Sequence, residues 1–235
     1  MPSPRADIEA ALAGERVLAR LDLAGADLRD LDLAGCHFDG MNLEGALFTR
    51  SVLTDASLKD ARLTGTVFEL AVLRRTRLVG ARGAGVKFAF ALLEETPLAD
   101  AILAGADFHG SSLLNCVLLA TELSGADFSA ADTSGSIFEN AGLERGAFQG
   151  SIATGARFSG CRLADADFTD ADLTRTHFER CLLARSRFIA AITEATRFEE
   201  CDLEEADFSG TGVTAGALKG SRAVGARFGR TTPGP

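Results

Sequence analysis

Cysteine and histidine are the residue types in this chain that could bind a metal or act as nucleophiles. The cysteines stand at Cys36, Cys116, Cys161, Cys181 and Cys201. The last three are spaced by twenty residues, so stacking them would align their thiols for a metal or redox site. Ala141 and Thr121 precede them at the same spacing, however, which indicates that cysteine serves here as a small apolar filler.

The three histidines are too dispersed to share a site. His37 and His177 differ by seven multiples of twenty, or roughly 34 Å if twenty residues make one level of stacked strands. The chain also has no clustered Ser, His and Asp residues and no paired Cys motif. We therefore expect no enzyme activity, no cofactor and no metal site.

A long stretch without cations is the first feature that points to binding. No Lys or Arg occurs between Lys87 and Arg145, in a chain whose net charge is -9. Nine acidic residues fill this stretch, and we name them the acidic belt: Glu94, Glu95, Asp100, Asp107, Glu122, Asp127, Asp132, Glu139 and Glu144. Such a surface repels nucleic acid and attracts basic protein surfaces. The basic run from Arg62 to Lys87 has no interleaved aromatic residues except Phe68, so we expect no direct nucleic-acid binding.

A second candidate binding surface is apolar. Seven residues, named here the apolar patch, lie outside the regular positions that carry Leu and Phe: Leu47, Val52, Val67, Leu70, Val72, Phe90 and Leu92. Contiguous exposed apolar groups usually mark an interface, whereas single ones are ordinary surface scatter. Their alignment in columns favours an interface, so we expect a protein partner or a homodimer through this lateral patch.

A five-residue frame must position all of these side chains. Every residue whose number ends in 3 or 8, from Leu23 to Phe228, is Leu or Phe with six exceptions. The residue two places earlier is nearly always small. A period of five fits neither a helix nor a flat strand. Like residues recur every twenty positions, which predicts a square solenoid with one pentad on each side.

This pattern predicts an all-β solenoid: a right-handed quadrilateral parallel β-helix of about ten coils, roughly 50 Å long. The expected segments are an N-terminal capping helix and lead-in over residues 1–20, a β-helix over 21–230 and a tail over 231–235. Within residues 1–20, the sequence predicts a helix over residues 4–13, with Ser3 as N-cap, Pro4 at its start and Gly14 at its end. Neither a secretory signal nor an apolar membrane-spanning run is present, so we expect a cytoplasmic location and no membrane association.

The repeats resemble the pentapeptide-repeat family, whose motif is roughly Ala-(Asp/Asn)-Leu-x-x. Matching triplets begin at Ala26, Ala106, Ala126, Ala166, Ala171 and Ala206. The resemblance implies the quadrilateral β-helix. Members that confer quinolone resistance bind DNA gyrase by mimicking DNA and dimerise through a C-terminal helical extension. No counterpart of that extension follows residue 230 in this sequence.

Two classes of function follow from this resemblance and these surfaces. The first is a DNA-mimicking binder of a type II topoisomerase, DNA gyrase or topoisomerase IV, which confers antibiotic resistance by protecting the enzyme from poisons or modulates it. The second is a structural scaffold for protein–protein interaction, for example in a secretion or signalling assembly. The fold alone does not select between them.

Overall fold

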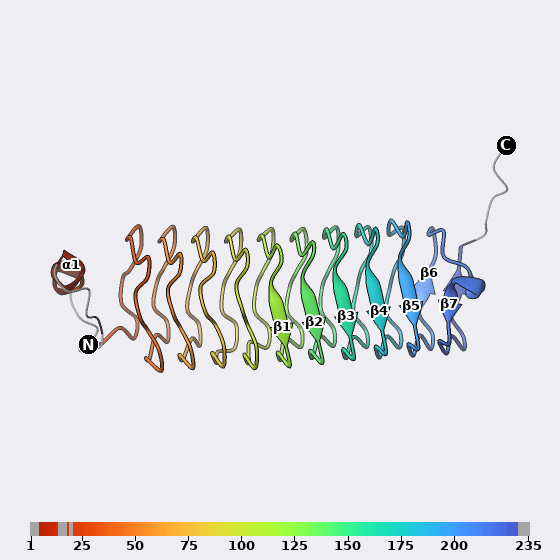
Figure 1. The fold of residues 1–235 in the computed structure, drawn as a ribbon, viewed down its shortest axis with the longest axis horizontal. Helices are drawn as coiled ribbons and strands as arrows, with labels where there is room; N and C mark the ends of the chain where they lie inside the picture. Colours follow the sequence, from red (N-terminus) through yellow and green to blue (C-terminus); the bar gives the residue numbers. More distant parts are fainter. Residues whose placement is uncertain (1–4, 14–17, 19–20, 230–235) are drawn as a thin grey trace.

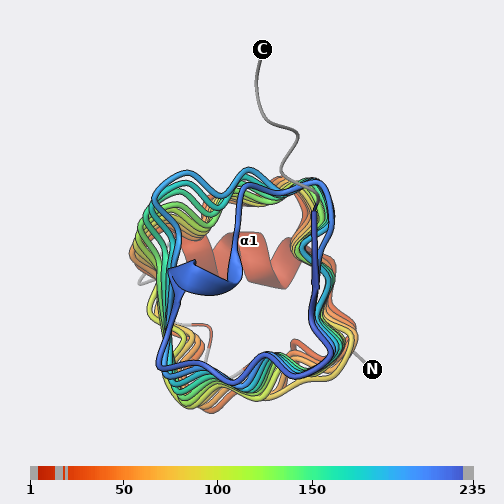
Figure 2. The ribbon, with the colours of Figure 1, turned by 90° about the vertical axis from the view of Figure 1, so that its right-hand side faces the viewer.

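The five-residue frame folds as a stack of four-sided coils. The computed structural model describes residues 5–13, 18 and 21–229. They form an all-β parallel solenoid with a short helix at its N-terminal end (Figure 1). Viewed along the stack, the chain traces a four-sided outline (Figure 2). The expected fold class is therefore confirmed.

Most pentads bury the central residue and the small residue two places before it, and leave the others half-buried or exposed. In the pentad around Leu43, for example, Leu43 is fully buried and Asn42 and Gly45 are exposed. The next small residue, Ala46, is also buried, and its amide donates to the Leu43 carbonyl at 2.9 Å, which closes a tight turn at the corner. Most buried hydroxyls at the small position donate to carbonyls, as in the 2.8 Å bond from Thr66 to Leu43, whereas that of Ser151 has no partner in the described structure.

Regular strands of two or three residues form where consecutive residues pair between coils. One sheet has the order β1–β2–β3–β4–β5–β7, and a second pairs β6 with β8. The bounds are β1 Val117–Leu119, β2 Ile137–Glu139, β3 Arg157–Ser159, β4 His177–Glu179, β5 Arg197–Glu199, β6 Asp207–Phe208, β7 Leu218–Lys219 and β8 Arg227–Phe228. The main sheet has six strands, and parallel bridges twenty residues apart link further levels of the stack from Asp27 to Arg222. The other contacts between levels are isolated parallel bridges twenty residues apart, because most sides are too short for a regular strand.

The corners use left-handed backbone. Residues whose numbers end in 0 or 5 have positive φ, whether they are glycine, such as Gly45 at 68°, or not, such as Asp55 at 60°. A Cβ makes this conformation unfavourable, and Gly, Asn and Asp tolerate it best, which explains their frequency at the corners but not that of Arg. Leu70 and Phe90 are large apolar exceptions, with φ of 59° and 57°.

The core consists of stacked rings. Phe108, Phe128 and Phe148 stack with centroids 4.8 Å apart, in a column that continues from Phe48 to Phe228. A second column contains Phe138, Phe158, Phe178 and Phe198. The two columns meet edge to face, as in the 6.2 Å contact between Phe128 and Phe138. Stacked and perpendicular pairs are the favoured geometries of aromatic rings, so the core is filled rather than hollow.

The two ends of the stack differ. Helix α1 (Arg5–Ala13) lies beside the first coil, buries Ile8 and packs Ala11 and Leu12 against the core (Figure 1). This helix was expected, although its predicted caps at Ser3, Pro4 and Gly14 fall outside the described residues. At the other end a single 3-10 turn, η1 (Ala215–Ala217), lies within the four-sided outline (Figure 2). The sequence frame did not predict this turn.

Candidate protein-binding surfaces

The acidic belt has a local structural basis. Asp107, Asp127 and Asp132 directly precede inward-facing residues, and each carboxylate accepts a hydrogen bond from the amide two residues later, at 3.0, 2.8 and 2.9 Å. Aspartate is suited to this cap because its short side chain reaches the following amide. The position is repeated outside the belt, as in Asp167 and Asp172. Capping therefore explains why aspartate occupies these positions but not why the stretch lacks cations.

Three belt carboxylates bind arginines from outside the belt. Glu94 pairs with Arg74 at 2.8 Å. Arg162 donates to Glu122 at 2.8 Å and to Glu144 at 2.6 Å, bridging two coils. Burial opposes ionisation of Glu144, but hydrogen bonds from its own amide, Arg162 and Ser124 outweigh burial and lower the pKa of this carboxyl.

The other six belt residues have no ion pair within the described part of the chain: Glu95, Asp100, Asp107, Asp127, Asp132 and Glu139. None is buried. Asp107 and Asp127 are bridge partners on one side of the coil, so their carboxylates stack, whereas Glu139 ends strand β2 on another side. The unpaired carboxylates of the belt therefore lie on more than one side of the solenoid and do not form a single stripe.

The apolar patch is brought together by stacking. Val52, Val72 and Leu92 are successive bridge partners, and Leu47 pairs with Val67 on the adjoining side. Leu70 and Phe90 occupy successive corners between these sides and are 52% and 53% exposed. Val52 is exposed as well, and the other four members are half-buried. The structure thus forms a contiguous surface from residues dispersed over 46 positions of sequence.

Phe90 is partly held by the next coil. Its ring meets the His109 ring edge-on, with centroids 5.3 Å apart. It also covers Gly110, where an added Cβ would lie 2.6 Å from the ring. Half of the side chain is nevertheless exposed, on a backbone conformation that disfavours a bulky residue. An exposed aromatic ring on an unfavourable backbone conformation is consistent with an interface.

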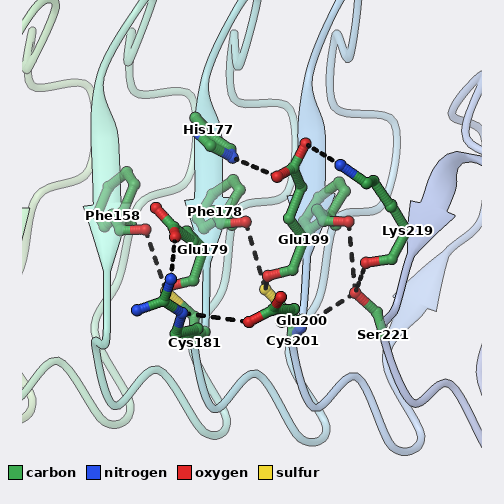
Figure 3. A network of polar contacts seen from close by, with 12 residues as sticks. Phe158, His177, Phe178, Glu179, Cys181, Glu199, Glu200, Cys201, Lys219 and Ser221 are labelled. Carbon is green, nitrogen blue, oxygen red and sulfur yellow. Dashed lines mark hydrogen bonds and ion pairs between the residues drawn. The ribbon is translucent and has the colours of Figure 1, made fainter.

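The cysteines occupy the positions expected of packing residues. All five are buried, and none of them forms a disulfide. The Cys181 thiol donates to the Phe158 carbonyl at 3.3 Å, and Cys201 donates to Phe178 at 3.4 Å (Figure 3). Burial raises the pKa of Cys116 to about 12. Among residues 5–13, 18 and 21–229, no group of three or more His, Cys, Asp and Glu side chains is arranged to hold a metal ion.

The sequence did not predict one surface feature. A hollow of about 390 Å³ is lined by Arg157, Arg175, His177, Ala195 and Arg197. Arg157, His177 and Arg197 begin the adjacent strands β3, β4 and β5 and are register partners. Their spacing of twenty residues is visible in the sequence and could have revealed this basic column.

Comparisons with known proteins are consistent with this architecture. Residues 17–50 and 51–82 match the model of pentapeptide repeats (8 copies), and residues 151–228 match the model of a pentapeptide repeat region. No curated protein sequence matches the chain. Within the described residues, no helix is long and apolar enough to cross a membrane.

Several solved structures are similar at low sequence identity. HetL from the cyanobacterium Nostoc sp. strain PCC 7120, a pentapeptide repeat protein involved in heterocyst differentiation regulation, is 20% identical with a TM-score of 0.49, covering 96% of this chain and 94% of that one. QnrB1, a plasmid-mediated fluoroquinolone resistance protein, is 17% identical with a TM-score of 0.48, covering 85% and 91%. A pentapeptide repeat protein from the Arabidopsis thaliana thylakoid lumen is 19% identical with a TM-score of 0.32, covering 61% and 72%.

Proposed function

Because this chain belongs to the pentapeptide-repeat family, we propose that it is a non-enzymatic protein that binds a type II topoisomerase, DNA gyrase or topoisomerase IV, as a mimic of DNA. Bound there, it protects the enzyme from topoisomerase poisons or modulates their effect. Family membership does not by itself select this function. The observation that carries the proposal is the charge density of the acidic belt.

The density of unpaired charge in the belt is close to that of DNA. Residues 94–144 span about two and a half coils, or about 12 Å along the axis at the spacing of parallel strands. Six carboxylates in this span have no ion pair within the described chain, which gives about one charge per 2 Å. Double-stranded DNA carries one charge per about 1.7 Å. Because these carboxylates lie on more than one side of the solenoid, a positively charged DNA-binding surface on one side would meet part of this charge.

The experiment replaces four unpaired belt residues with their isosteric amides: Glu95→Gln, Asp107→Asn, Asp127→Asn and Glu139→Gln. Asparagine keeps the oxygen that caps the His109 and Ser129 amides, so the fold is preserved. We expect wild-type protein to inhibit or protect gyrase in a supercoiling assay with and without a poison. The belt variant should lose this effect, and binding of the wild type should weaken steeply with salt.

A matched control removes four charges elsewhere: Asp170→Asn, Asp172→Asn, Glu194→Gln and Glu205→Gln. These residues also have no ion pair within the described chain, and Asp172 makes the same cap to the Thr174 amide. The control should act on gyrase like wild type. If both variants lose the effect on gyrase equally, the net charge of the protein and not the acidic belt is responsible. If the wild type affects neither gyrase nor topoisomerase IV, the topoisomerase proposal is rejected.

The apolar patch supports a second candidate, a scaffold that associates through this surface with another copy of itself. This proposal rests on the exposure of two large apolar side chains at the corners. Leu70 is 52% exposed and Phe90 is 53% exposed. Val72→Asp with Leu92→Asp should convert an associated form to a monomer in light scattering. Ile152→Asp is the control, because Ile152 is an exposed member of the same column of outward residues. A wild-type monomer at high concentration would reject self-association.

A further inference from the structure

The hollow on strands β3, β4 and β5 contains a concentration of unpaired positive charge. Most described arginines have a carboxylate partner, as in the bidentate pairs Arg50–Asp30, Arg75–Asp55 and Arg185–Asp165. The side chains of Arg157, Arg175 and Arg197 have neither an ion pair nor a hydrogen bond within the described chain. Like charges held together without a counter-ion repel, and a concave site lined by one sign of charge attracts the opposite sign.

The fold places these guanidinium groups around one space. Arg157 and Arg197 begin strands on either side of β4, so their Cα atoms are two strand spacings, about 10 Å, apart. Arg175 reaches the same hollow from a corner with φ of 58°, and the corner of the next coil carries only the small Ala195. Each guanidinium is a planar fork of donors that matches a phosphate in geometry and charge.

His177 adds an unsatisfied polar atom to the lining. It lies between the two arginines in the register, and its Nε2 is buried without a hydrogen-bond partner in the described structure. The nearest carboxylate oxygen, from Glu199, is 3.8 Å away, beyond hydrogen-bonding distance. A buried nitrogen without a partner costs free energy that a bound ligand or water would recover.

Two carboxylates flank the hollow. Glu179 is paired with Arg180 at 2.8 Å, whereas Glu199 lies 3.8 Å from both His177 and Lys219 (Figure 3). Neither glutamate lines the hollow. A larger hollow of about 630 Å³, on the side of the coil that carries β6 and β8, is different, because Glu205 and Asp207 accompany its three arginines. The site on β3–β5 is thus the more strongly positive of the two.

We propose that this hollow binds the phosphate group of a small phosphorylated molecule, held by Arg157, Arg175 and Arg197. Its volume of about 390 Å³ falls within the range of small-molecule sites and exceeds what a bare phosphate fills. This assignment is independent of topoisomerase binding, since no residue of the acidic belt or the apolar patch lines the hollow.

The test is isothermal titration of the full chain at low ionic strength with inorganic phosphate, glucose 6-phosphate and unphosphorylated glucose. We expect saturable binding of the two phosphate compounds and none of glucose. Tighter binding of glucose 6-phosphate than of inorganic phosphate would identify a phosphomonoester as the source, and equal binding would identify free phosphate. The absence of saturable binding by both at millimolar concentration would overturn the proposal.

Two triple variants separate a built site from general positive charge. Arg157→Gln, Arg175→Gln and Arg197→Gln together should weaken binding by at least about tenfold, since hydrogen bonds to charged groups are the strong ones. The control changes three other arginines that also have no ion pair in the described chain: Arg77→Gln, Arg82→Gln and Arg145→Gln. It should bind like wild type. Equal weakening in both variants, with unchanged circular dichroism, would show only diffuse attraction and would reject the site.

Discussion

Gly83 lies directly against the main chain of Leu63 in the preceding coil. A Cβ built on Gly83 would stand 2.5 Å from the Leu63 carbonyl carbon and 2.6 Å from the Thr64 nitrogen. Gly83 occupies a position that carries leucine in most other pentads, so the sequence suggests a weak point in the core. The structure shows instead that the neighbouring backbone has closed over the position and that no side chain fits there.

Replacing Gly83 with alanine should therefore destabilise the protein, by about 1–3 kcal/mol for an overpacked site, and leucine should cost more. Gly85→Ala is the matched control, because nothing lies within 4 Å of its added Cβ and only its positive φ of 63° is unfavourable. Its cost should be about 1 kcal/mol. Urea denaturation measures both, and a stabilised Gly83→Leu variant would contradict the closed backbone.

Phe128→Ala should lower the free energy of unfolding by about 3–5 kcal/mol, because it leaves a cavity in a buried stack. The ring contacts Phe108 and Phe148 at 4.8 Å and Phe138 edge-on. Phe90→Ala is the comparison, since that ring is half exposed and contacts mainly His109 and Gly110. It should cost far less. Similar denaturation midpoints for the two variants would contradict the difference in packing.

Stability should depend on acid through Asp27. A side-chain hydrogen bond from Arg29 is the largest influence on this carboxyl and holds its pKa at about 2, below the ordinary 3.8. A depressed folded-state pKa stabilises the folded protein above the unfolded pKa, and this contribution is lost as pH falls from about 4 through about 2. Because the side chain is 38% exposed, solvent screening limits the contribution to less than about 1 kcal/mol.

The measurement for Asp27 is urea denaturation of wild type and Asp27→Asn between pH 5 and pH 2. Asparagine can keep the cap to the Arg29 amide while removing the titrating group. The advantage of wild type should shrink as the pH falls. A constant difference in unfolding free energy across this range would show that the pair with Arg29 does not contribute.

Cys116 should be unreactive in the native protein. Burial raises the pKa of its thiol to about 12, and the nearby charges of Glu94 and Glu95 act in the same direction. The thiolate is the reactive form, so almost none exists at pH 8. A variant that retains only Cys116, with alanine at the other four cysteines, should react with a thiol reagent only after denaturant is added. Rapid labelling without denaturant would contradict its burial.

The sequence alone determined much of the fold. The spacing of Leu and Phe at numbers ending in 3 and 8 identified the inward positions, because burial of one centre in every pentad leaves a period that neither a helix nor a flat strand produces. The recurrence every twenty residues predicted that Val52, Val72 and Leu92 would be neighbours, and they are successive bridge partners. The helix near the N-terminus was also predicted.

The tertiary structure decided what depends on distances between coils. An arginine of another coil can neutralise a belt carboxylate only if its side chain reaches that carboxylate. Arg162 reaches Glu122, 40 residues away in the sequence, and Glu144, 18 residues away. Whether a small centre is a gap or a closed contact, as at Gly83, depends on how near the backbone of the neighbouring coil lies. The hollow around Arg175 exists because the corner of the next coil carries Ala195. A repeat fixes which residues face inward and which are stacked, but side-chain reach and local backbone shifts determine the charges and spaces on the surface.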